Sequence, residues 1–142
     1  MKARVLLGVL LTTLALAQAI AAQPAPPNTY AWEEVVERLS RAQEIVLISV
    51  EVLDDALSDT LTQLGYSGVN VYLLTNDRSS AITRLGRSGA VLLGGYAGPL
   101  VIVDESVFAY VDEYEAFVEA PSGGLAALYL KQFGVAASGG AK

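Results

Sequence analysis

Carboxylates are the side chains best able to do chemistry in this sequence, because the chain contains neither histidine nor cysteine. Without imidazole or thiolate, the chain cannot shuttle protons through histidine at neutral pH or attack a substrate through cysteine. Zinc or iron sites built from His and Cys ligands are excluded for the same reason. Carboxylates remain as general acids or hard-metal ligands. Among them are the adjacent pairs Asp54-Asp55, Asp104-Glu105 and Asp112-Glu113. Adjacent side chains diverge along a strand, so we expect each pair to cap a helix or solvate a turn.

A second polar group follows the apolar positions 69–74, and it comprises Thr75, Asn76, Asp77 and Arg78. If the apolar run is a parallel strand, these four residues lie at the carboxyl edge of the sheet, where open α/β sheets bind ligands. They are therefore our candidate ligand site. Arg78 also forms, with Arg84 and Arg87, the main cluster of basic residues, which favours either an anion pocket or the solvated face of a helix.

The stretch 94–104, GGYAGPLVIVD, has glycines that invite comparison with phosphate-binding loops. It lacks the Lys-Ser/Thr ending of such loops, and Pro99 leads into a strand where a helix N-terminus should receive the phosphate. We interpret it as a flexible connection into a buried strand.

The elements that must position these residues can be predicted from the apolar patterns. Apolar runs predict strands at 45–50, 69–74, 90–93, 100–103, 107–110 and 114–118. Amphipathic stretches predict helices from about residue 29 and at 54–65, 80–87 and 125–133. In the first helix, Val35 and Leu39 fall on the core stripe, whereas Arg38 is expected to face solvent.

The spacing of the strands predicts the topology. Crossovers long enough for helices separate the first three strands, which indicates a parallel βαβ first half, and turn-length gaps then indicate an antiparallel second half. The predicted fold class is α/β, with a mixed sheet and helices on both faces. A fully parallel, flavodoxin-like sheet is the alternative.

Residues 1–22 have the layout of a secretory signal peptide, with Lys2 and Arg4 ahead of an apolar run. Small residues near its end place cleavage after Ala19, Ala21 or Ala22. The run is shorter than the roughly 20 residues of a spanning helix, and no cysteine follows it for lipid attachment. We expect an exported chain, periplasmic or secreted, without a stable membrane anchor. A proline-rich spacer (23–28), one domain (29–134) and a flexible tail (135–142) should follow.

The charge balance is strongly acidic. The net charge of the whole chain is −6, and without the first 22 residues seven Lys and Arg face 15 Asp and Glu. No basic residue occurs between Ser88 and Leu130. Because nucleic acids and anionic lipids are bound through basic side chains, this balance predicts no nucleic acid as a partner.

Several segments together resemble one half of a phospholipase D-like domain. The first strand resembles that family's A-x-x-x-I pattern at 42–47, the second its R-G-V-x-V-x-L-L at 68–74, and the third its G-I-x-V at 89–92. The segment 100–104 is similar to F-L-I-I-D, which closes the family's H-x-K-x-x-x-x-D motif, and 126–133 resembles its terminal A-x-x-Y-x-x-x-F helix. The resemblance covers most of the chain after residue 28.

In that family the His attacks phosphorus, the Lys holds phosphate oxygens, and two motifs meet across a pseudo-twofold axis or a homodimer. Here Ala97 and Pro99 stand at the His and Lys positions, so the motif is degenerate and only Asp104 carries over. The resemblance therefore implies a non-catalytic domain without cofactor or metal that binds an unknown protein partner or forms a homodimer. The alternative is a divergent phosphodiesterase using carboxylates and a hard metal, with Asp104 and the 75–78 loop as its site.

Overall fold

The computed structural model describes residues 28–135. Within this range the strands are β1 (Thr29–Tyr30), β2 (Ile45–Ser49), β3 (Asn70–Leu74), β4 (Val91–Gly94), β5 (Leu100–Val103), β6 (Ser106–Val111) and β7 (Ala116–Pro121). The helices are α2 (Trp32–Leu39), α3 (Asp55–Tyr66), α4 (Arg78–Leu85), α5 (Gly123–Gln132) and the 3-10 helix η2 (Asp112–Tyr114).

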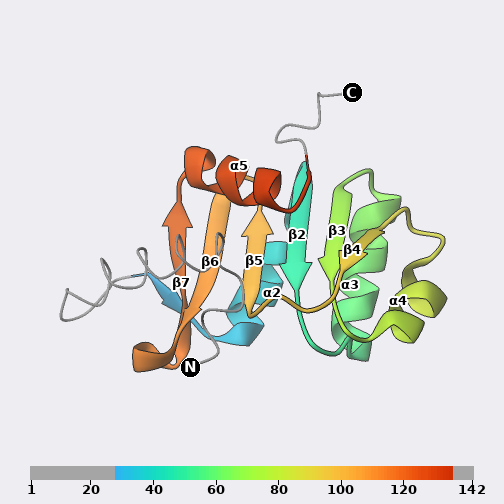
Figure 1. The fold of residues 1–142 in the computed structure, drawn as a ribbon, viewed down its shortest axis with the longest axis horizontal. Helices are drawn as coiled ribbons and strands as arrows, with labels where there is room; N and C mark the ends of the chain where they lie inside the picture. Colours follow the sequence, from blue (N-terminus) through green and yellow to red (C-terminus); the bar gives the residue numbers. More distant parts are fainter. Residues whose placement is uncertain (1–27, 136–142) are drawn as a thin grey trace.

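The seven strands form one mixed sheet in the order β1-β7-β6-β5-β2-β3-β4 (Figure 1). Strands β2, β3 and β4 run parallel, whereas β5 pairs antiparallel with β2, and β6, β7 and β1 continue the antiparallel pattern. The predicted mixed α/β sheet is confirmed. The fully parallel alternative is wrong, because short turns rather than helical crossovers connect β5, β6 and β7.

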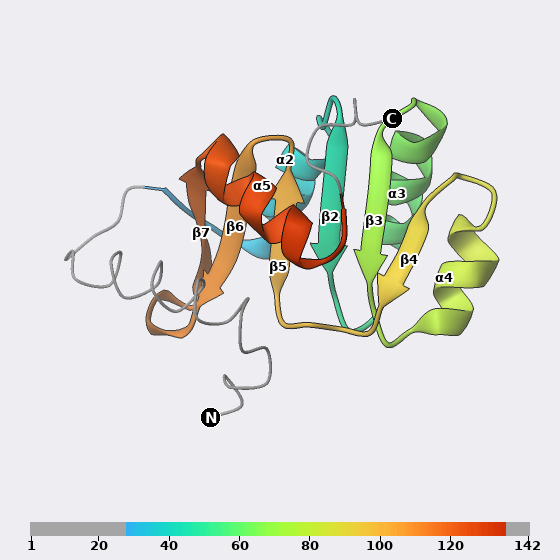
Figure 2. The same ribbon diagram turned by 45° about the horizontal axis from the view of Figure 1, so that its top comes forward.

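Helices cover both faces of the sheet. Helices α2, α3 and α4 lie on one face and α5 on the other (Figures 1 and 2). The central strand β2 has every residue buried, and its side chains alternate between the two faces: Val46 and Ile48 pack with the three-helix side, Ile45 and Leu47 with α5. Burial on both faces explains why this strand is a continuous apolar run in the sequence.

Side-chain caps set where two of the helices begin. The Asp54 carboxylate accepts the Leu57 N–H at 2.8 Å at the start of α3, and the Ser122 hydroxyl accepts the Leu125 N–H at 3.1 Å at the start of α5. Both caps satisfy a backbone N–H that has no partner within its own helix.

Two differences from the sequence predictions change the ends of the sheet, and the other boundaries shift by one or two residues, as in α4, which is Arg78–Leu85 rather than 80–87. The first helix begins at Trp32 rather than near residue 29, because Thr29 and Tyr30 pair with β7 as an edge strand. The last strand is Ala116–Pro121 rather than 114–118, because η2 and a left-handed Glu115 (φ 49°) lengthen the β6–β7 turn. A two-residue strand and a left-handed turn leave no pattern for hydrophobic periodicity to detect.

The predicted signal peptide, most of the predicted spacer and most of the predicted tail lie outside the described residues. The described chain begins at Asn28, whose side chain donates to the Glu119 carbonyl at 2.6 Å, and ends at the buried Val135. No helix within residues 28–135 has the length and apolar character needed to cross a membrane.

Candidate functional site

The predicted site residues are divided between the two ends of the central strands. Because β5 runs antiparallel to β2, Asp104 at the end of β5 lies beside Ile45 at the start of β2. The 75–78 segment follows β3 at the opposite end of these strands, where the parallel strands β2, β3 and β4 all end. A strand rises about 3.3 Å per residue, so five-residue β2 separates the two groups by roughly 15 Å. The structure therefore does not bring Asp104 and the 75–78 loop into one site.

Asp104 holds the start of β2 in place. Its backbone is left-handed, with φ 53°, and its carboxylate accepts N–H bonds from Gln43 at 3.0 Å, Glu44 at 2.8 Å and Ile45 at 3.0 Å. Three donors to one carboxylate occupy most of its acceptor sites. The residue that the sequence resemblance matched to a catalytic Asp thus serves the turn between β5 and β6 and the entry to β2.

Ala97 and Pro99 lie in the β4–β5 connection, at the carboxyl edge of the parallel strands. The Ala97 N–H donates to the Ser49 hydroxyl at 2.9 Å, which ties this connection to the end of β2. Gly98, between them, has φ 96°, a conformation that a side chain would strain. Neither Ala97 nor Pro99 supplies a nucleophile or a charge.

The 75–78 segment binds the loops on either side of it. The fully buried Thr75 hydroxyl donates to the Glu51 carbonyl at 3.0 Å and accepts the Asp77 N–H at 3.1 Å. The Asn76 side-chain oxygen accepts the Tyr96 N–H at 3.2 Å. Thr75 and Asn76 therefore use polar atoms to connect the loops after β2, β3 and β4.

Asp77 is similarly engaged. Its carboxylate accepts the Leu53 N–H at 3.2 Å, and this bond, with further bonds from Ser80, holds its pKa below the ordinary value. Arg78 differs from its neighbours, because its side chain is exposed and forms no ion pair with another described residue. The anion-pocket interpretation therefore rests on Arg78, not on the residues preceding it.

A partly buried ionic cluster beside β7 was missed by the sequence analysis. Glu119 in β7 accepts hydrogen bonds from both terminal nitrogens of Arg38 (3.0 and 2.8 Å), from Tyr30 (3.0 Å) and from Ser106 (2.7 Å). The Arg38 guanidinium also lies 5.1 Å from the Phe108 ring centroid, within cation–π range. The Arg38 side chain is 34% exposed, but its guanidinium is directed to Glu119, a partner that the sequence prediction missed.

The electrostatics of this cluster are structural rather than catalytic. Bonds from Arg38, followed by those from Ser106 and Tyr30, lower the pKa of Glu119 to about 2, although burial opposes the shift. The bond to Glu119 in turn raises the pKa of Tyr30. A carboxylate this acidic, with each oxygen accepting two donors, is a poor general base near neutral pH. The sequence signal for it was a single Glu inside the apolar run 116–120.

Metal binding finds no support in the described side chains. Residues 28–135 contain no group of three acidic side chains placed to hold a metal ion. The hard-metal site proposed around Asp104 would need such a group, since Ca²⁺ and Mg²⁺ take several oxygen ligands.

Comparison with models of known protein families and with curated protein sequences gives no match. Among solved structures, the chain is similar to TrmBL2, an archaeal chromatin protein whose structure shows a novel mode of DNA binding. The TM-score is 0.59 at 17% sequence identity, and the match covers 87% of this chain and 58% of that one. The chain thus spans less than two thirds of TrmBL2, and the likeness shows a shared fold.

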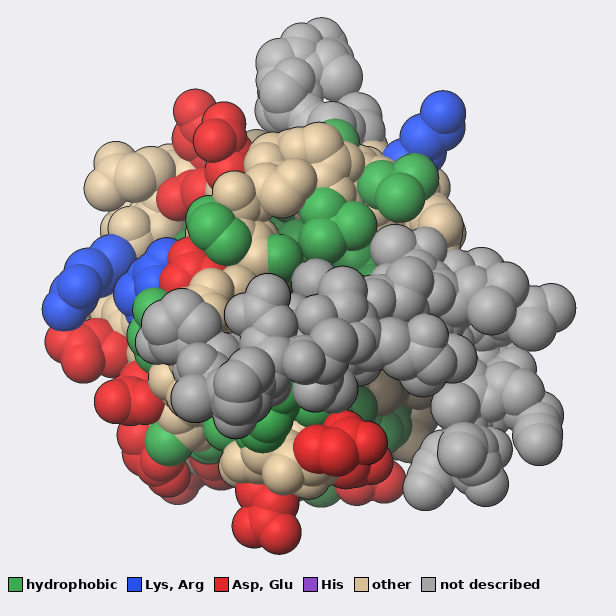
Figure 3. All heavy atoms as spheres, turned by 90° about the vertical axis from the view of Figure 1, so that its left-hand side faces the viewer, with side chains coloured by type: hydrophobic (Ala, Val, Ile, Leu, Met, Phe, Trp, Pro, Cys, Tyr) green, Lys and Arg blue, Asp and Glu red, His purple; other side chains and the backbone are tan. Residues whose placement is uncertain are grey.

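This likeness corrects one prediction from the sequence. The exclusion of nucleic acid as a partner is wrong, because the same fold occurs in a DNA-binding chromatin protein. The prediction failed because it summed charge over the whole chain, whereas a nucleic acid meets one surface. Acidic side chains are spread over the face shown in Figure 3. Three of the six described basic residues instead gather at α4 and the turn after it: Arg78, Arg84 and Arg87.

Proposed function

We propose that this chain is a non-catalytic binding domain built on half of a phospholipase D-like fold. The observation that carries the proposal is the engagement of Asp104, the one residue left from the catalytic motif. Its carboxylate is bound by the N–H groups of Gln43, Glu44 and Ile45. It therefore has a structural role that needs no substrate.

The other motif positions support the same proposal. Ala97 and Pro99 offer no group for attack on phosphorus, and the whole sequence holds no histidine that another copy could contribute. A fold that is retained without its catalytic side chains is consistent with a domain that binds a partner through its surface. The proposal also includes export, on the basis of the signal-like residues 1–22.

The divergent phosphodiesterase is less well supported by the geometry. The two parts of its proposed site, Asp104 and the 75–78 loop, lie at opposite ends of the central strands. The carboxylates of Asp104 and Asp77 both accept backbone N–H groups. A reaction between these groups would require a rearrangement of the sheet.

DNA binding is a second candidate function. It is favoured by the fold shared with a DNA-binding chromatin protein, together with the exposed Arg78 and Arg87 at one end of the molecule. Such binding would be weak and strongly salt-dependent, because few phosphates could be neutralised. Anisotropy of a labelled duplex at low and physiological salt, for the wild type and Arg78→Ala/Arg87→Ala, tests it.

The test of the main proposal is hydrolysis of bis(p-nitrophenyl) phosphate by the full chain, with Asp104→Asn and Asp77→Asn as variants and with and without a chelator. We expect no turnover above buffer in any sample. Turnover that is lost in Asp104→Asn, while circular dichroism shows a folded variant, would overturn the proposal. Turnover lost only with chelator or in Asp77→Asn would instead favour the phosphodiesterase.

A further inference from the structure

We propose that the open edge of the sheet at β4, with the apolar groove beside it, binds an extended acidic and apolar segment of a partner protein. The segment would pair with β4 as an additional strand, the mode of recognition known as β-augmentation. This inference rests on the proposed binding function, for which it names the surface and the chemistry of the partner.

Strand β4 ends the sheet and lacks two of the usual protections of an edge, charge and proline, although its pairing with β3 shifts register after Leu92. None of its four residues is buried, and Val91 is 45% exposed. Its sequence, VLLG, contains no charged residue and no proline, the features by which edge strands commonly avoid pairing with other chains. The outward N–H and C=O groups of β4 are therefore available to another strand.

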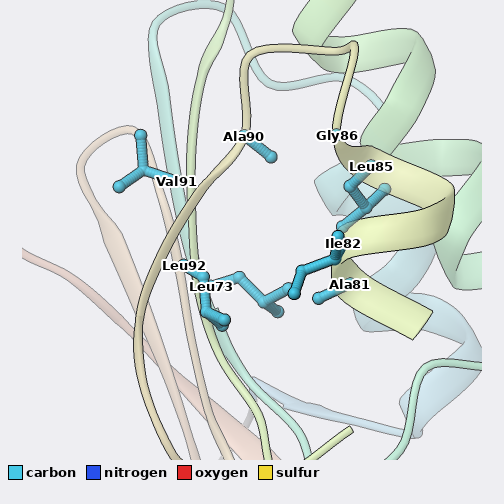
Figure 4. Close-up of a pocket in the computed structure, with 8 residues that line it drawn as sticks. All are labelled: Leu73, Ala81, Ile82, Leu85, Gly86, Ala90, Val91 and Leu92. Atoms are coloured by element: carbon cyan, nitrogen blue, oxygen red, sulfur yellow. The ribbon is translucent and has the colours of Figure 1, made fainter. Parts of the chain in front are cut away.

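An apolar groove lies beside this edge, between β4 and α4. Figure 4 shows Ile82 and Leu85 of α4 facing Ala90 and Leu92, with Val91 directed to the other side of the strand. Ile82 is 63% exposed although it lines the groove. An added strand with apolar side chains on one face would cover Ile82 and fill this space.

The charge around the groove selects the partner. Arg78 lies one turn before Ile82 on α4, and Arg87 lies in the turn that leads to β4. Neither forms an ion pair with another described residue, whereas Arg84 pairs with Asp55. Two unpaired guanidinium groups thus flank an apolar groove in an otherwise acidic domain, which favours a partner with carboxylates beside its apolar residues.

A second copy of this chain fits the edge less well. In an antiparallel pairing of two β4 strands, the carboxyl end of each lies beside the amino end of the other. Arg78, near the carboxyl end, would then face Arg87 of the other copy, and like charges would meet at both ends. DNA would satisfy the arginines but not the apolar groove or the free backbone groups.

The test uses an array of fluorescein-labelled peptides of about eight residues, the length of an ordinary strand, that alternate Asp or Glu with Val, Ile, Leu or Phe. Matched peptides carry Lys in place of the acidic residues. We expect the full chain to bind acidic members, by anisotropy, and to shift the amide NMR signals of residues 91–94. Leu92→Pro, which removes an N–H on the side of β4 away from β3, and Arg78→Glu/Arg87→Glu should each weaken binding at least about tenfold.

The control is Lys131→Glu on α5, an exposed charge reversal on the opposite face of the sheet, which should leave binding unchanged. Binding that is unchanged in both Leu92→Pro and Arg78→Glu/Arg87→Glu, or no binding by any acidic peptide, would overturn the inference. So would a preference for a duplex DNA probe that leaves the amide signals of β4 unchanged, or a dimer that Leu92→Pro dissociates. None of these results would restore phosphodiester hydrolysis, so a failure here is distinguishable from a failure of the proposed function.

Discussion

At one edge of the sheet, β7 and the short β1 are joined to α2 through the Glu119 cluster, in which a buried carboxylate has four hydrogen bonds from three side chains. At the other edge, β4 has no buried residue and no charge. The first edge uses its polar groups to stabilise the fold, whereas the second leaves backbone groups and an apolar surface free. The difference separates the elements that stabilise the fold from the edge at which we propose binding.

The largest effect is expected for Phe108→Ala at the closed edge. Phe108 is fully buried, its ring lies 5.6 Å from that of Tyr30, and Arg38 lies over it. Truncation should lower the free energy of unfolding by about 4 kcal/mol, as for other buried aromatic residues. Urea denaturation followed by circular dichroism measures it. Val91→Ala is the matched control at the open edge, and equal losses at both sites would break the comparison.

Glu119→Gln tests the ionic part of the closed edge through its pH dependence. Because the pKa of Glu119 falls from an ordinary 4.5 to about 2 on folding, its ionised form stabilises the fold above pH 4.5. That contribution, roughly 3 kcal/mol, is lost as the pH falls toward 2. The unfolding free energies of the wild type and the variant should therefore differ at pH 7 and converge in acid. A difference in unfolding free energy that does not change with pH would contradict the stabilising role given to ionised Glu119.

Asp104→Asn should have an intermediate effect. Asparagine tolerates the left-handed backbone but loses the charge that accepts three N–H groups. We expect a loss of about 1–2 kcal/mol in the free energy of unfolding, measured in urea. The adjacent and exposed Glu105→Gln should stay within about 0.5 kcal/mol of the wild type. Equal effects of the two changes would remove the structural role given to Asp104.

The smallest effect on stability is expected for Val91→Lys on β4. Its side chain is 45% exposed, so the free energy of unfolding, measured in urea, should change by less than about 0.5 kcal/mol. A lysine should also reduce self-association through this edge. If the substitution instead destabilises the fold as much as Asp104→Asn does, β4 is part of the stable core and the contrast between the edges fails.

Patterns within short windows predicted much of the fold. The apolar run at 45–50 predicted a strand buried on both faces, and the change from helical to turn-length gaps predicted the mixed sheet, since both depend on local spacing. The site was less predictable. That Asp104 lies far from Thr75 depends on the direction of β5, and the pairing of Arg38 with Glu119 joins residues 81 apart. No local pattern contains either relation.

The pairing of β1 with β7 also bears on how the chain acquires its structure. Tyr30 and Glu119, which close this edge, are 89 positions apart, whereas β2 and β3, or β5, β6 and β7, pair with near neighbours in the sequence. Distant contacts cost more chain entropy and form later. During synthesis, the residues of β1 and α2 are made first but meet their partners among the last. A chain stopped before β7 would therefore contain strands β2 to β6, but β1 would have no strand to pair with.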